Sequence, residues 1–266
     1  MTDAPLIDIH NATIFRGDTR VFENFSMTIG QHEQVAILGP NGCGKTTLLK
    51  TLNREIYPVF KEQSWVRILG RQRWNVWDLR AHIGIVSHEL QMRYTKTNTG
   101  LHVVLSGYLS SIGIHGLLAG RIGREQQHRA LAVMDELAIG DLADKSLDKM
   151  STGQQRRCLL ARALVHDPDT LILDEPTAGL DLTASFDLLA RIRGLVEAGK
   201  SILLVTHQLN EIPQDIRRVI LLKQGKIVAD GEKREVLTGE NLYRTYDTKI
   251  RVSEVDGYYL ASPGGD

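Results

Sequence analysis

The stretch "QVAILGPNGCGKTT", residues 34–47, decides the fold of this 266-residue chain. An apolar run is followed by a glycine-rich turn and then by a helical pattern, and residues 39–46 fit GxxxxGK[ST]. Glycines let successive backbone N–H groups turn toward phosphate oxygens, and the positive end of the following helix adds to that field. The sequence therefore predicts a phosphate-binding loop (P-loop) between a buried strand and a helix.

Two side chains of this loop have expected roles. Lys45 would bridge the β- and γ-phosphates of a nucleotide, and the hydroxyl of Thr46 would ligate Mg²⁺. A plain glycine-rich helix cap explains the glycines but not Gly-Lys-Thr in that register. The residues predicted to bind the nucleotide here are Gly39, Pro40, Asn41, Gly42, Cys43, Gly44, Lys45, Thr46 and Thr47.

The second half of a nucleotide site should be an apolar strand that ends in a carboxylate, and "TLILDEP" supplies it. Asp174 is expected to hold Mg²⁺, and Glu175 to polarise the attacking water as general base. A solvated strand end would be the better reading of two adjacent carboxylates without a P-loop. His207 ends the buried run "ILLVTH", so a parallel sheet would place it at the ligand-binding edge, where it could contact the γ-phosphate.

Composition narrows the class of protein. The 32 basic and 32 acidic side chains balance, so a nucleic-acid partner is not expected. The two cysteines belong to no CxxC pair, and no stretch approaches the ~20 apolar residues of a membrane span. We therefore expect a soluble, cytosolic protein.

Hydrophobic patterns outline the rest of the chain. Residues 6–38 alternate as antiparallel strands do, and residues 57–86 return to strands and turns. Helical patterns dominate residues 100–163, with Leu131, Met134 and Leu137 at helix-face spacing. "DTLILDEP" and "SILLVTH" resemble strands buried on both faces. "VILLKQGKIVADG" predicts a hairpin that turns at Gln224 and Gly225. The C-terminus predicts one more strand and a frayed tail.

The P-loop, "KMSTGQ", "LILDEPTAGLD" and "VTH" resemble, in order and rough spacing, the motifs of the nucleotide-binding subunits of ABC transporters. This resemblance covers nearly the whole chain. It implies a single domain over 1–266: a P-loop NTPase α/β core with a mainly parallel sheet, an N-terminal antiparallel β subdomain, an inserted α-helical subdomain at about 100–163 and a C-terminal extension at about 240–266.

The same resemblance implies an ATPase that needs ATP and Mg²⁺. Two cassettes, as a homodimer or with a second ABC subunit, would enclose two ATP molecules head to tail and drive transmembrane permease subunits at the inner face of the membrane. Ser151, Gly153 and Gln154 match the signature motif, which faces the γ-phosphate on the other cassette. Residues 178–181 match the loop that crosses the dimer interface, and His207 matches the switch histidine.

Three positions depart from the family pattern. The signature begins with Met150, and Thr152 stands where a glycine is usual, so we expect altered ATPase activity. His88 stands where the family has a glutamine that senses Mg²⁺, and Gln91 follows three residues later. Either His88 or Gln91 takes this role, and we favour Gln91 because an amide oxygen is the better Mg²⁺ ligand. Phe15 is the candidate for stacking on adenine, with Arg16 as its rival and a core role for Phe15 as the third possibility.

Other functions explain less of the sequence. A soluble ABC-type ATPase acting on DNA or ribosomes would carry long coiled coils or two cassettes, and a P-loop kinase or GTPase explains neither the signature nor "VTH". A regulatory module without hydrolysis would require Thr152 or His88 to abolish activity. The transported substrate and the direction of transport stay open.

Overall fold

A computed structural model describes residues 4–114, 120 and 122–265, and the chain divides into two units. The first unit comprises Met1–Val76 and Ser201–Asp266, and the second comprises Trp77–Lys200. The boundaries differ from the predicted subdivision, because residues 100–163 form only part of the second unit. The single domain over 1–266 and its subdomain limits stay predictions.

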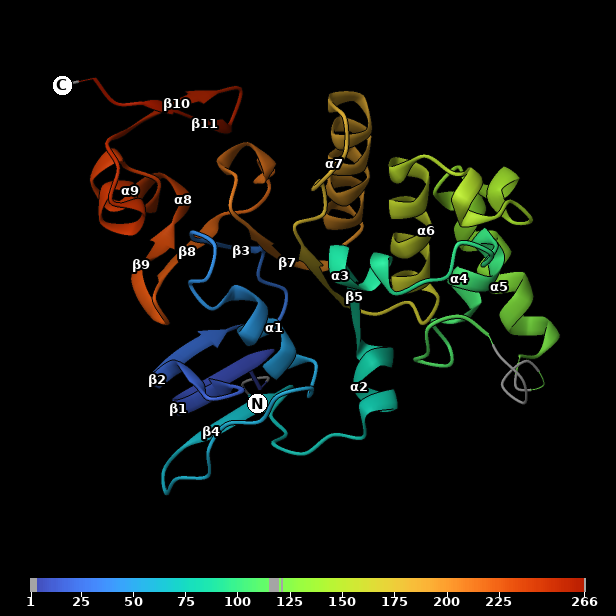
Figure 1. The fold of residues 1–266 in the computed structure, drawn as a ribbon, viewed down its shortest axis with the longest axis horizontal. Helices are drawn as coiled ribbons and strands as arrows, with labels where there is room; N and C mark the ends of the chain where they lie inside the picture. Colours follow the sequence, from blue (N-terminus) through green and yellow to red (C-terminus); the bar gives the residue numbers. More distant parts are fainter. Residues whose placement is uncertain (1–3, 115–119, 121, 266) are drawn as a thin grey trace. The chain divides into compact units, whose positions relative to one another are not determined.

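The first unit contains a three-stranded antiparallel sheet in the order β2-β1-β4 (Figure 1). Its strands are β1 (Ile7–Arg16), β2 (Thr19–Ile29) and β4 (Trp65–Ile68). Phe25, Met27 and Ile29 of β2 alternate with exposed residues and are buried, and Phe22 is buried as well. The predicted N-terminal antiparallel strands are thereby confirmed.

A second set of strands in the same unit has the order β7-β3-β8-β9. They are β7 (Ser201–Thr206), β3 (Val35–Leu38), β8 (Arg218–Lys223) and β9 (Lys226–Glu232). β3 runs parallel to both β7 and β8, so its assignment to the antiparallel strands was wrong. All four residues of β3 are buried, as in the central strand of a parallel sheet.

Two hairpins complete the first unit. β8 and β9 are antiparallel, and Gln224 and Gly225 turn between them with positive φ, as predicted. β10 (Ile250–Val255) and β11 (Tyr258–Pro263) form a second hairpin, so the prediction of one strand and a frayed tail was wrong. The overlooked signal is Asp-Gly at 256–257, where both residues have the positive φ of a hairpin turn.

The helices of the first unit are α1 (Lys45–Leu52), α8 (Lys233–Val236) and α9 (Gly239–Tyr246).

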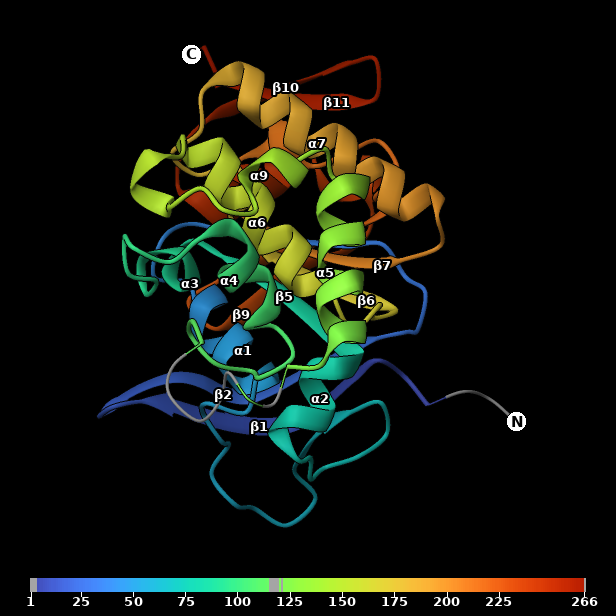
Figure 2. The same cartoon turned by 90° about the vertical axis from the view of Figure 1, so that its right-hand side faces the viewer.

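The second unit combines two parallel strands, β5 (Ile83–Ser87) and β6 (Thr170–Asp174), with helices. In Figures 1 and 2, α4, α5 and α6 pack together. The helices are α3 (His88–Met92), α4 (Gly100–Leu105), α5 (Arg124–Glu136), α6 (Thr152–Leu164), α7 (Leu182–Glu197) and α2 (Val76–His82), which starts at the last residue of the first unit. Helix α2 corrects the prediction that residues 57–86 contain only strands and turns.

The predicted face of α5 is confirmed at Met134 and at Leu137, which directly follows the helix, and is wrong at Leu131. Ala130, Val133, Met134 and Leu137 are buried, whereas Leu131 is 38% exposed. The i, i+3, i+4 spacing that starts at Ala130 is the one that packs inward, because it brings a small side chain to the contact. The fold is α/β, with mainly parallel strands and an antiparallel N-terminal sheet. No helix in the described part of the chain has the length and apolarity to cross a bilayer.

Candidate nucleotide-binding site

The P-loop occupies the turn between β3 and α1, where glycine is required at two positions. Gly44 has φ +118°, and a Cβ there would lie 2.8 Å from the Cζ of Phe22. A Cβ on Gly39 would lie 2.2 Å from the carbonyl oxygen of Leu222. Larger residues would therefore force the loop away from the sheet.

The donors of the loop suit an anion. Lys45 is 6% exposed, and its Nζ lies 2.6 Å from the carbonyl oxygen of Gly39 and 3.1 Å from that of Pro40. Helix α1 has no acidic residue in its first turn and no side-chain cap, and its first internal bond runs from the N–H of Leu48 to Gly44. The preceding N–H groups have no acceptor within the helix, so this end suits a polyphosphate.

The β8–β9 turn contacts the P-loop through a backbone hydrogen bond. The N–H of Gly225 donates to the carbonyl of Cys43 at 2.9 Å, and Cys43 is 2% exposed. Burial raises the pKa of the Cys43 thiol, against the opposing charge of Lys45. Cys43 therefore contributes packing and backbone groups, with its thiol held neutral.

His207 lies at the edge of the sheet that carries the P-loop. Leu38, which precedes the loop, is paired with Thr206 in the parallel ladder of β3 and β7. The Thr206 hydroxyl donates to the carboxylate of Glu211 and accepts the N–H of Gln208 at 3.0 Å. These bonds support the segment that carries His207. The P-loop and His207 thus follow adjacent strand ends, and the predicted role of His207 stays a prediction.

Asp174 and Glu175 end β6 in the second unit. Ser87, the last residue of β5, is paired with Asp174, so the loops after the two strands start side by side. Glu175 has φ +47°, a region that costs a non-glycine residue about 1–3 kcal/mol. The turn after it is closed by a bond from the N–H of Ala178 to the carbonyl of Glu175 at 3.1 Å.

The two candidates for the Mg²⁺-sensing position have different surroundings. His88 is exposed and starts α3, which Ser87 caps with its hydroxyl. Gln91 is only 9% exposed, and its Nε2 donates to the Oε1 of Gln155 at 2.8 Å. The predicted ligand Gln91 thus packs against α6, while its rival His88 lies at the strand end.

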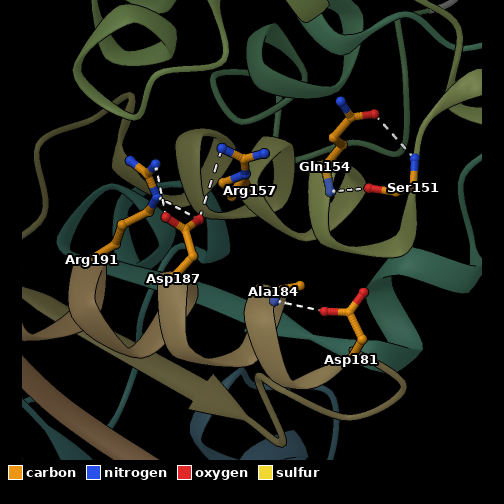
Figure 3. A network of polar contacts seen from close by, with 7 residues as sticks. All are labelled: Ser151, Gln154, Arg157, Asp181, Ala184, Asp187 and Arg191. Atoms are coloured by element: carbon orange, nitrogen blue, oxygen red, sulfur yellow. Dashed lines mark hydrogen bonds and ion pairs between the residues drawn. The ribbon is translucent and has the colours of Figure 1, made fainter.

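The signature residues form the start of α6 (Figure 3). The hydroxyl of Ser151 accepts the N–H of Gln154 at 3.2 Å, and the Oε1 of Gln154 accepts the N–H of Ser151 at 3.1 Å. This reciprocal cap leaves Thr152 exposed at the first helical position. Backbone and hydroxyl groups of the signature are therefore held in place without the Thr152 side chain.

Helix α7 packs beside α6, and an ion pair links the two helices (Figure 3). Asp181, the last residue of the interface-loop match, caps α7 by accepting the N–H of Ala184 at 2.8 Å. Asp187 on α7 lies 3.9 Å from Arg157 on α6 and 3.1 Å from Arg191 on its own helix. The signature and the loop at 178–181 thus belong to one supported part of the second unit.

Phe15 and Arg16 both lie on the surface at the end of β1. Phe15 is 39% exposed, so the possibility that it is plain core is wrong. Its role as the adenine-stacking residue stays a prediction, with Arg16 as the rival.

Arg156 and Glu211 are two of the buried charged residues that were not predicted from the sequence. Arg156 is fully buried in α6, and Glu211 is 2% exposed beside Thr206. A signal for Arg156 was present, since it shares a helix face with the apolar residues Leu159, Leu160 and Ala163. Charged side chains on an apolar face are seldom buried without a partner.

Comparisons with known proteins agree with these motifs. A family model described as ABC transporter matches residues 22–178. The chain is 32% identical over 252 residues to YlmA of Bacillus subtilis, an uncharacterized ABC transporter ATP-binding protein, with 93% of each chain covered. It is 30% identical over 256 residues to the hemin import ATP-binding protein HmuV of Bradyrhizobium diazoefficiens, covering 93% of this chain and 90% of that one.

A solved structure extends the likeness. It is a dimeric ATP-binding cassette in a post-hydrolysis state with ADP and Pi, 26% identical to this chain, with a TM-score of 0.69 over 85% of this chain and 98% of the other. Family model, relatives and fold agree with the P-loop and the motifs that follow it. The chain therefore belongs to the ABC transporter family as an ATP-binding subunit.

Proposed function

We propose that this chain binds and hydrolyses ATP as the ATPase subunit of an ABC transporter. The observation that carries this proposal is the P-loop itself, with the buried Lys45 amine inside it and an uncapped helix start behind it. Such a cradle suits the phosphates of a nucleotide. His207, next to this loop, then contacts the γ-phosphate and holds the attacking water in line.

The remaining chemical roles follow the motif matches. Glu175 acts as general base, and Thr46 and Asp174 supply oxygen ligands of the kind that Mg²⁺ takes together with substrate phosphates. Bound Mg²⁺ would neutralise charge on the phosphates. Gln91 remains the proposed third ligand.

The signature residues complete a site on a second molecule. Ser151, Gly153 and Gln154 lie at the start of α6, whose positive end favours phosphate. The chain therefore works as a dimer, with itself or with a second ABC subunit, on permease subunits at the inner face of the membrane. The likeness to a hemin import subunit favours import.

ATP turnover of the parent and of Glu175→Gln tests the proposal. We expect turnover in the parent and almost none in the variant, because the amide cannot take a proton from water. Glu197→Gln is the matched control, since Glu197 lies at the end of α7 with its side chain 67% exposed. Glu197→Gln should match the parent.

Dimer formation gives a second readout. Glu175→Gln should form an ATP-dependent dimer in gel filtration with light scattering, because bound ATP is not consumed. Equal and negligible turnover in all three proteins would contradict the enzyme assignment. A Glu175→Gln variant that stays monomeric in saturating ATP would contradict the sandwich arrangement.

A further inference from the structure

Arg156 contacts both chain segments that follow β5 and β6. It belongs to α6 in the second unit and is 0% exposed. Its Nη2 lies 3.3 Å from the Nδ1 of His88, which follows β5, and 3.3 Å from the carbonyl oxygen of Ala178, which follows β6. One guanidinium nitrogen is thus within hydrogen-bond distance of both segments.

The chemistry of these two contacts determines the state of His88. A guanidinium only donates hydrogen bonds, and Nη2 carries two hydrogens, one for each acceptor. The Nδ1 of His88 must therefore present a lone pair to Arg156. In the neutral imidazole the proton then resides on Nε2, which is a donor.

His88 is also well placed to use this donor. It is exposed, and it directly follows Ser87, the ladder partner of Asp174. His88, at the start of α3, and Glu175 consequently follow the carboxyl ends of two neighbouring parallel strands, where ligands bind in such sheets. Gln91, by contrast, is buried and directs its amide nitrogen at Gln155.

We propose that Arg156 is a positioning residue that holds His88 as the Nε2–H tautomer, and that this N–H donates to a phosphate oxygen of the nucleotide. His88 then does not ligate Mg²⁺, because its outward nitrogen has a proton in place of a lone pair. This inference rests on the proposed function for the identity of the ligand. The tautomer itself requires no nucleotide.

The tautomer is measured by two-bond ¹H–¹⁵N NMR on nucleotide-free protein labelled at histidine, with His88 assigned from the signal that His88→Gln removes. We expect the Nε2–H pattern in the parent. Arg156→Met, which removes the donors, should shift His88 toward a tautomer mixture, and Arg156→Lys should restore Nε2–H by keeping a donor. His102 in α4 is the internal control, because its signal should be the same in all these proteins.

The phosphate contact is measured as ATP affinity with and without Mg²⁺. We expect His88→Ala to weaken binding about tenfold in both conditions, since a bond to a charged phosphate oxygen is lost in both. A His88→Ala defect that appears only with Mg²⁺ would assign His88 as a metal ligand and overturn the proposal. Circular dichroism checks that each variant folds, and Arg156→Lys keeps the test informative if Arg156→Met does not.

The two possible failures are distinguishable. An Nδ1–H tautomer in a parent that binds ATP overturns this inference and leaves the ATPase assignment intact. A parent that binds no ATP overturns the proposed function and the phosphate contact together.

Discussion

Leu38 and Thr206 are direct partners in the parallel ladder of β3 and β7, so the P-loop and His207 leave the sheet from adjacent strand ends. A histidine at this place can act on the γ-phosphate without contributing much to the binding of the whole nucleotide. We expect His207→Ala to lower kcat about 100-fold, the usual effect of removing one preorganised donor, with ATP affinity nearly unchanged.

Steady-state ATP turnover and equilibrium ATP binding check this prediction together. His128→Ala is the control, because His128 is an exposed histidine on α5. A His207→Ala variant that loses affinity and turnover in equal proportion would assign His207 to ground-state binding.

The bond between Thr206 and Glu211 predicts a stability effect. Thr206 is 0% exposed, and its hydroxyl is a donor to Glu211 and an acceptor for Gln208. Thr206→Val keeps the shape but removes both bonds, so we expect the free energy of unfolding to fall by about 1–3 kcal/mol. Thr206→Ser keeps the hydroxyl and should cost less.

Urea unfolding of the parent and both variants measures the difference. A loss in Thr206→Ser without a loss in Thr206→Val would show that the methyl group, and not the hydroxyl, supports this segment.

The contacts around α6 predict unequal contributions to stability. The Ser151 hydroxyl caps the helix, and an N-cap serine changed to alanine typically costs about 1 kcal/mol. Asp187 is 44% exposed and pairs with Arg157 and Arg191, and exposed ion pairs contribute less, about 0.2–1 kcal/mol. Ser151→Ala should therefore destabilise the protein more than Asp187→Asn.

Thermal or urea unfolding at low and high salt checks this order. The small effect of Asp187→Asn should shrink in high salt, whereas that of Ser151→Ala should persist. A larger loss in Asp187→Asn would show that the α6–α7 ion pairs stabilise the fold more than the cap does.

Local chemistry explains which parts of the fold could be predicted from the sequence. The P-loop and the buried strands at 170–174 and 201–206 were visible because glycine spacing and uninterrupted apolar runs are local signals. The parallel pairing of β3 was not visible, because its partners β7 and β8 lie more than 160 residues further along the chain. A four-residue apolar strand carries too little pattern to indicate its neighbours.

In the candidate site, too, local signals were visible in the sequence and long-range contacts were not. Motif spacing predicted roles for Lys45, Glu175 and His207, but it did not indicate the side chains that contact the neighbouring segments. Arg156 and Glu211 act through contacts with Ala178 and Thr206, which depend on how the chain folds back in space. Only the charge on an apolar helix face could have pointed to Arg156.

The two cysteines predict a pH-dependent reactivity. Cys43 is 2% exposed and Cys158 is 0% exposed, and burial raises the pKa of both thiols, that of Cys158 to about 12. Because only the thiolate reacts, we expect neither cysteine of the folded protein to react with a disulfide reagent at pH 8, and both to react in urea.

The raised pKa of Cys158 also determines how the free energy of unfolding changes with pH. Burial favours the neutral thiol of Cys158, so its contribution to stability is complete below the ordinary pKa of 9.0 and is lost as the pH rises toward 12. Cys158→Ala should therefore show a weaker decline of the free energy of unfolding across that interval than the parent does. Rapid reaction of one thiol in the folded protein, assigned with Cys43→Ala, would show that its side of the fold opens under native conditions, since a closed core excludes the reagent.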